Sequence, residues 1–85
     1  MSEDKAKVIV YGAEWCAPCH VAKQYLKSKN VAYEYINVDE NREAGMKIAQ
    51  TTGWTAIPII QVVDEYILGF NREKLEGALR EHKLV

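Results

Sequence analysis

Two cysteines, Cys16 and Cys19, are the residues of this sequence best suited to covalent chemistry, and they are its only cysteines. An apolar run at residues 7–11 ends shortly before them, and Pro18 begins a stretch of helical periodicity. A helix N-terminus directs free N–H groups and positive partial charge at a nearby sulfur. These stabilise the thiolate, which is the form that attacks disulfides. The spacing therefore predicts a redox-active dithiol where a strand meets a helix.

The two thiols are expected to have different roles. Cys16 precedes the helix, so it should be the more exposed sulfur and the nucleophile. Cys19 lies one turn inside the helix and should be the resolving thiol, which attacks the mixed disulfide on Cys16 and releases reduced substrate. The alternative is a pair of buried structural cysteines, which would not explain two adjacent thiols beside Pro18.

Two metal sites can be considered and are not favoured. Cys16-x-x-Cys19-His20 spells the motif for c-type haem attachment, but haem ligation needs an export route and a second axial ligand. Structural zinc needs four ligands, and the other histidine, His82, lies near the far end of the chain. We therefore expect no metal and no cofactor, and we interpret His20 as a helix-surface residue that tunes the thiols.

Composition limits the remaining function classes. The 85 residues suffice for one domain, residues 1–85, and the 48% hydrophobic and 27% charged content argues against disorder. With 11 Lys and Arg against 12 Asp and Glu, the chain has no basic excess for non-specific nucleic-acid binding. It contains no apolar run of the roughly 18 residues that a membrane helix needs. The charged first five residues do not resemble a signal peptide, so a cytoplasmic location is expected.

Hydrophobic periodicity predicts the elements that position the thiols. The expected order is a strand at 7–11, a helix at 18–29, a strand near a sheet edge at 32–38, a helix at 42–52, strands at 58–63 and 66–68 around a turn at Asp64-Glu65, and a last helix from 72. The inner face of the first helix is assigned to Val21, Ala22, Tyr25 and Leu26. The first two strands should be parallel and the hairpin antiparallel. The prediction is an α/β chain of order β-α-β-α-β-β-α, with a four-stranded mixed sheet and helices on both faces.

Three segments carry a family resemblance. Ala13-Glu14-Trp15-Cys16-Ala17-Pro18-Cys19 resembles the active-site segment of thioredoxins, with Ala17 where glycine is usual. Thr55-Ala56-Ile57-Pro58 resembles the cis-proline segment of thioredoxins and glutaredoxins, and residues 68–75 are similar to the tail of small glutaredoxin-like redoxins. The segments occur in family order, and the resemblance covers the chain from about Lys7 to Leu84. It implies the minimal thioredoxin fold and a protein disulfide oxidoreductase.

The same resemblance implies a substrate groove beside Cys16. The Ile57–Pro58 bond should be cis and face Cys16, with the Ile57 backbone free to pair with an extended substrate. The other residues that the resemblance places at the groove are Trp15 on its apolar rim, Ala17, Pro18, Gly69 and Phe70.

Departures from the glutaredoxin pattern concern the reductant. The Ala17-Pro18 pair has the thioredoxin order, because glutaredoxins usually carry proline directly after the first cysteine. Ala13 stands where they have a basic residue, Glu14 would repel a dicarboxylate, and Asn71 replaces part of their second Gly-Gly and aspartate segment. The resemblance thus implies a monomer that reduces disulfide-containing proteins and is recharged by a thioredoxin-reductase-type enzyme. Some similar redoxins donate electrons to ribonucleotide reductase.

Three alternatives stay open. One is a glutathione-dependent glutaredoxin, and another is a non-catalytic binding module in which the disulfide is a staple. The third is a disulfide isomerase or oxidase, although proline just before the second cysteine resembles the reducing members of the family.

Overall fold

The computed structural model describes residues 7–85, so the first five residues, on which the expectation about a signal peptide depends, lie outside the described part of the chain. The elements follow the predicted order β-α-β-α-β-β-α. Their bounds are β1 Val8–Gly12, α1 Ala17–Ser28, β2 Glu34–Asn37, α2 Arg42–Thr52, β3 Ile59–Val62, β4 Glu65–Leu68 and α3 Arg72–Glu81.

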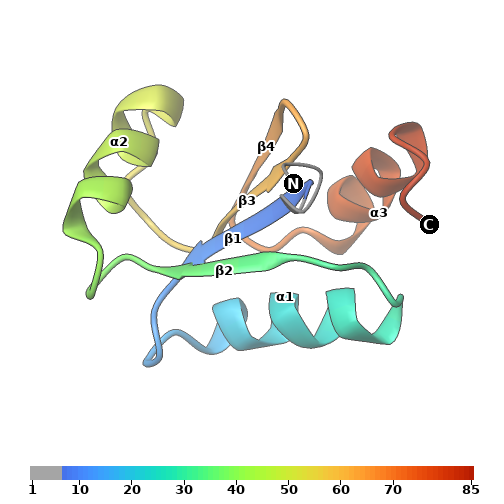
Figure 1. The fold of residues 1–85 in the computed structure, drawn as a ribbon, viewed down its shortest axis with the longest axis horizontal. Coiled ribbons are helices and arrows are strands. Elements are labelled where there is room, and N and C mark those ends of the chain that lie inside the picture. The colour runs from blue at the N-terminus through green and yellow to red at the C-terminus, as the bar shows by residue number, and fades with distance from the viewer. Residues whose placement is uncertain (1–6) are drawn as a thin grey trace, which may run out of the picture.

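The four strands form one mixed sheet in the order β2-β1-β3-β4 (Figure 1). β1 pairs parallel with β2 and antiparallel with β3, and β3 pairs antiparallel with β4. The predicted sheet and its strand directions are confirmed, and β2 lies at an edge as expected. β2 is shorter than predicted, because its pairing with β1 begins only at Glu34, opposite Ile9.

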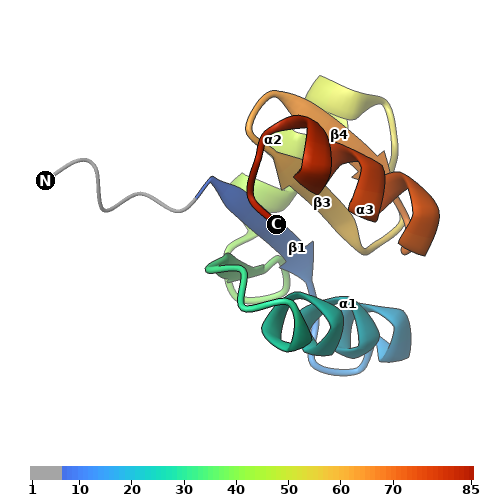
Figure 2. The same ribbon diagram turned by 90° about the vertical axis from the view of Figure 1, so that its right-hand side faces the viewer.

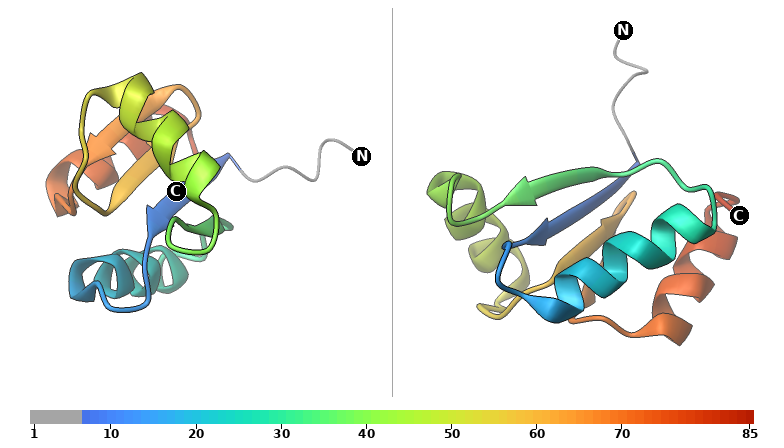
Figure 3. Two further views of the ribbon diagram at one scale, coloured as in Figure 1. Left: turned by 90° about the vertical axis from the view of Figure 1, so that its left-hand side faces the viewer. Right: turned by 90° about the horizontal axis from the view of Figure 1, so that it is seen from below.

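Helices cover both faces of the sheet. α1 and α3 share one face, where Leu26 and Leu79 are fully buried in one core with Val10 and Ile60 of the central strands. α2 lies on the opposite side, as the two side views show (Figures 2 and 3). β1 is one of the two central strands of the sheet, and the chain that leaves its C-terminal end leads directly into α1.

Two details of α1 differ from the prediction. The helix begins at Ala17, so Pro18 occupies its second position, which is tolerated because the first four N–H groups of a helix lack partners anyway. Val21, predicted to face the core, is 46% exposed. It lies in the early part of α1, which faces the segment around Ile57 and Pro58.

The helix ends follow the sequence signals. Asn41 and Asn71 cap α2 and α3 with their side chains, and Gly53 ends α2 at φ 72°. Asn30, shortly after α1, adopts a left-handed conformation, which asparagine tolerates better than most residues. The glycine inside α2, Gly45, has a packing reason that the sequence did not show: a Cβ there would lie 3.0 Å from the Cβ of Val38.

The hairpin turn lies one residue earlier than predicted. Val62 pairs with Glu65, so the loop consists of Val63 and Asp64 instead of Asp64 and Glu65. Val63 adopts φ 58°, a left-handed conformation that is costly for a β-branched residue.

We expect Val63→Asn to raise the free energy of unfolding by about 1 kcal/mol, since asparagine tolerates the left-handed conformation better than valine. Denaturant unfolding at constant m-value measures the change. Val85→Asn, at another exposed valine, is the control and should have no such effect. A loss of stability in Val63→Asn would show that the contacts of Val63 outweigh its backbone strain.

Among residues 7–85, no helix combines the length and the apolar character needed to cross a bilayer.

Candidate active site

Cys16 occupies the N-cap position of α1. Its own side chain makes no capping hydrogen bond, so the sulfur is not used to close the helix end. A turn from Ala13 holds the residue, with the Cys16 N–H donating to the Ala13 carbonyl at 3.2 Å. The thiol faces the Ile57 carbonyl oxygen at 3.9 Å. The predicted helix-start position is thus present, and the segment preceding Pro58 lies against the sulfur.

Cys19 lies directly behind Cys16. Both cysteines are buried, Cys19 completely and Cys16 with 4% exposure, so the predicted difference in exposure is small. The Cys19 thiol donates toward the Cys16 sulfur at 2.6 Å. Burial, and then this hydrogen bond, raise the pKa of Cys19 to about 12. Cys19 is therefore protonated at neutral pH in the reduced protein. This state is compatible with a thiol that reacts only in the second step of an exchange reaction.

Gly12 makes room for the buried thiol. A Cβ at this position would lie 2.7 Å from the Cys19 Sγ and 2.9 Å from its Cβ. Both contacts are shorter than packed atoms allow, so any side chain here must displace Cys19. The last residue of β1 thus sets how closely the start of α1 approaches the sheet.

The Ile57–Pro58 peptide bond is cis, as the resemblance implied. An apolar groove of about 440 Å³ opens beside it. Its lining brings together six of the predicted groove residues and one that was not predicted: Ala17, Pro18, Ile57, Pro58, Gly69, Phe70 and Val21. Among residues 7–85, no charged side chain lines this groove.

Trp15 stands outside that lining. Its side chain is among the most exposed large apolar groups of residues 7–85, at 72%, and its Nε1–H donates to the Asp39 carboxylate at 2.7 Å. The hydrogen bond ties the loop before Cys16 to the loop between β2 and α2. Trp15 thus lies next to Cys16 in sequence, but its indole is turned toward Asp39.

Glu14 makes two contacts within the fold. Its carboxylate accepts a hydrogen bond from the Tyr35 hydroxyl at 3.2 Å, and its backbone carbonyl lies 2.7 Å from His20 Nε2. Burial and the Glu14 carboxylate raise the pKa of Tyr35 to about 12. The Lys23 ammonium lies 3.8 Å from the centre of the Tyr35 ring. A charged cluster thus flanks the dithiol on the β2 side.

The second histidine does not join the dithiol. His82 lies near Asp64 and Glu65, at 3.7 and 3.8 Å, on the hairpin and the end of α3. Among residues 7–85, no group of three His, Cys, Asp or Glu side chains is arranged to hold a metal ion.

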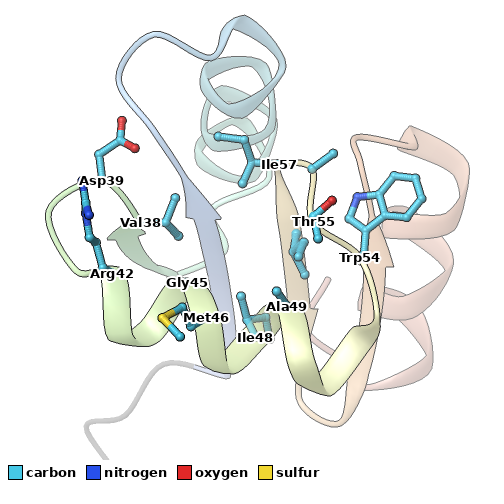
Figure 4. A pocket seen from close by; sticks show the side chains of 12 residues that line it. Val38, Asp39, Arg42, Gly45, Met46, Ile48, Ala49, Trp54, Thr55 and Ile57 are labelled. Atoms are coloured by element: carbon cyan, nitrogen blue, oxygen red, sulfur yellow. The ribbon is translucent and has the colours of Figure 1, made fainter.

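A second cavity of about 480 Å³ lies on the other side of Ile57 (Figure 4). α2 and the segment before Pro58 form its walls. Asp39 and Arg42 lie toward one end and Trp54 and Thr55 toward the other. Its remaining lining is mostly apolar: Val38, Gly45, Met46, Ile48, Ala49, Ala56, Ile57 and Ile59.

Sequence reasoning missed Gly12, Val21 and Tyr35 as parts of the site. Only Val21 left a usable signal, because it lies one helical turn after Ala17 and shares its side of the helix. The contacts of Gly12 and Tyr35 join residues that are far apart in sequence, and no local pattern marks them.

Comparison with known proteins agrees with this geometry. The glutaredoxin family model matches residues 8–67. Glutaredoxin 3 of Escherichia coli is 33% identical over 64 residues, covering 75% of this chain and 77% of that protein. The glutaredoxin-like protein NrdH of Lactococcus lactis is 32% identical over 68 residues, covering 80% and 93%. The crystal structure of a glutaredoxin from Archaeoglobus fulgidus superposes with a TM-score of 0.81 at 29% identity, covering 92% and 90%.

The fold is accordingly the thioredoxin fold in its minimal form. With a Cys-x-x-Cys pair at the start of α1 and a cis-proline segment against it, the chain belongs to the glutaredoxin family of thiol-disulfide oxidoreductases.

Proposed function

We propose that this oxidoreductase reduces disulfides in proteins, with Cys16 as the attacking thiol and Cys19 as the resolving thiol, and that a thioredoxin-reductase-type flavoprotein recharges it. The observation that carries the proposal is the asymmetry of the pair. Cys16 caps α1 and faces Ile57, which lines the apolar groove, whereas Cys19 lies one turn inside α1 with a fully buried thiol of raised pKa.

The reaction has two exchange steps. The Cys16 thiolate attacks a substrate sulfur, the substrate S–S bond breaks, and one substrate thiolate leaves and takes a proton. The Cys19 thiol then loses its proton and attacks the Cys16 sulfur, so that the Cys16–substrate bond breaks and the second substrate thiol is released. The protein ends as an internal disulfide, and two electrons from the reductase restore the dithiol.

The charges around the groove support a flavoprotein as reductant rather than glutathione. Ala13, which stands where glutaredoxins have a basic residue, is fully buried and offers no cation to glutathione. The Asn71 side-chain oxygen accepts a hydrogen bond from the Lys74 N–H and so caps α3. The same oxygen is therefore less available to bind glutathione. Each charge-assisted contact to glutathione would be worth about 1.5–3 kcal/mol, and the groove offers no charged lining.

We expect fast insulin reduction with NADPH and thioredoxin reductase, and turnover slower by about tenfold or more with NADPH, glutathione and glutathione reductase, because tenfold corresponds to one lost contact of about 1.4 kcal/mol. Coupled NADPH oxidation measures both rates. Efficient glutathione-coupled turnover, with no response to thioredoxin reductases, would identify a glutathione-dependent glutaredoxin instead. No reduction with either donor or with dithiothreitol would favour the non-catalytic binding module.

Reversing the charge of Glu14 tests whether this side chain disfavours glutathione as the reductant. Glu14→Lys places a cation two residues before Cys16 and should raise glutathione-coupled turnover severalfold without raising the rate with thioredoxin reductase. Glu40→Lys makes the same charge change at another exposed position and is the matched control. Equal effects of the two variants would show that only net charge matters.

The natural substrate is proposed from the resemblance alone. A ribonucleotide reductase with an exchangeable disulfide is the first candidate, since similar small redoxins serve that enzyme. Following deoxyribonucleotide formation with this protein as the electron donor tests the candidate directly.

A further inference from the structure

Cys19 must ionise to act, and its surroundings oppose this. The side chain is fully buried, and its thiol already donates to the Cys16 sulfur. When Cys16 carries substrate in a mixed disulfide, the attack still requires the Cys19 thiolate. A positive charge near the buried sulfur would therefore speed the second step.

Lys23 supplies such a charge. It lies one helical turn after Cys19 in α1, and residues four apart share a helix face. Of the groups acting on Cys19, the Lys23 ammonium and the Ala13 backbone lower its pKa, against burial and Cys16, which raise it. A lysine side chain is flexible, so the size of this effect depends on where the ammonium is held.

Tyr35 holds it. The Lys23 Nζ lies 3.8 Å from the centre of the Tyr35 ring, within the range of a cation–π contact. The ring is fixed at its far end, where its hydroxyl donates to Glu14. It also lies against the dithiol: a Cβ at Gly12 would meet the Cys19 Sγ at 2.7 Å and the Tyr35 Cε1 at 3.4 Å, so the thiol and the ring edge flank the same backbone position.

We propose that Tyr35 is a positioning residue for the second exchange step: its ring holds the Lys23 ammonium beside the buried Cys19 thiol, which can then ionise and attack the mixed disulfide on Cys16. This inference rests on the proposed two-step reduction. Lys23 does not touch the substrate, and Tyr35 acts only through Lys23.

The titratable groups near Cys19 come from three segments. Cys16, His20 and Lys23 belong to α1 and its cap, Glu14 to the preceding loop, and Tyr35 to β2. The Glu14 carboxylate accepts the hydrogen bond from the Tyr35 hydroxyl at the far end of the ring. The Ile57–Pro58 segment on the remaining side has no titratable side chain.

Stopped-flow reaction with excess 2,2′-dithiodipyridine separates the two steps. The first release of thiopyridone reports attack by Cys16, and its rate rises with reagent concentration. The second release reports attack by Cys19, and its rate does not depend on reagent concentration. Both rates are measured on the full chain from pH 6 to pH 9, at low and high salt.

We expect Lys23→Gln and Tyr35→Leu to slow the second release about three- to tenfold at low salt, with the first release within twofold of wild type. High salt should reduce the difference, because it screens partly exposed charges. Lys23→Arg, which keeps the cation and the anchored ring, should stay within twofold of wild type. Tyr35→Phe keeps the ring but loses its hydrogen bond to Glu14, so its rate of second release should lie between those of wild type and Tyr35→Leu. The double variant Lys23→Gln/Tyr35→Leu should be no slower than Lys23→Gln alone, since both changes remove one interaction.

Lys27→Gln, one turn further along α1, is the charge-matched control and should leave both releases unchanged. A wild-type rate of second release in Lys23→Gln would overturn the inference, and so would additive effects in the double variant, which would mean that Tyr35 acts by packing. If Tyr35→Leu does not fold, the Lys23 variants and their salt dependence still decide. A failure of the first release in wild type would instead refute the proposed function.

Discussion

Cys16→Ser is expected to lose disulfide reductase activity by about a thousandfold or more, because the thiolate is the nucleophile and a serine hydroxyl does not ionise at neutral pH. Insulin reduction with thioredoxin reductase and NADPH measures the loss. Cys19→Ser should also stop turnover, but after the first step, since Cys16 keeps its helix-start position and its groove.

Gln24→Ser, on an exposed position of the same helix, is the control and should retain full activity. Substantial turnover by Cys16→Ser would mean that Cys19 attacks substrate directly, against its complete burial. Retained activity in Cys19→Ser with protein substrates would mean that an external thiol resolves the mixed disulfide, as in a monothiol mechanism that uses glutathione.

The second large effect is expected at Gly12. Gly12→Ala should slow the second thiopyridone release by about tenfold or more and lower the free energy of unfolding by about 1–3 kcal/mol, the usual range for overpacking a tight core. The added Cβ would lie 2.9 Å from the Cβ of Cys19, so the start of α1 must move, and not only a side-chain end. Attack by Cys16 should be less affected, because the three atoms nearest the added Cβ belong to Cys19 and Tyr35 and none belongs to Cys16.

Gly77→Ala is the matched control. Gly77 lies within α3, and a Cβ there meets no atom within 4 Å. This variant should leave both exchange steps unchanged and raise the free energy of unfolding by about 0.5–1 kcal/mol, from the better helix propensity of alanine. If Gly12→Ala behaves like Gly77→Ala, the close contact with Cys19 is not what fixes the resolving thiol.

Local patterns were sufficient for much of the fold. The dithiol, the caps at Asn41 and Asn71 and the left-handed Gly53 each depend on residues within a few positions of one another. The order of elements followed from their periodicity, and the cis bond before Pro58 followed from the family resemblance. These features could be predicted because each is specified by a short stretch of sequence.

The features that could not be predicted depend on packing between distant residues. Val21 has the spacing of a core residue, but its side chain lines the same groove as Ile57. The turn at Val63 is set by pairing of Val62 with Glu65, which overrides the preference of valine for extended backbone. Tyr35 and Glu14 are 21 positions apart, and only the folded chain brings the phenol to the carboxylate.

Trapping the intermediate tests the central account most directly. Cys19→Ser and Cys16→Ser are each mixed with an oxidised protein substrate at pH 7, quenched with acid and analysed by intact-mass and peptide mass spectrometry. The account predicts that Cys19→Ser accumulates a stable mixed disulfide on Cys16, and that Cys16→Ser forms little adduct, because Cys19 is fully buried and burial is the largest cause that raises its pKa. Equal adducts in the two variants, or an adduct on Cys19 alone, would contradict the assignment of Cys16 as the attacking thiol and Cys19 as the resolving thiol.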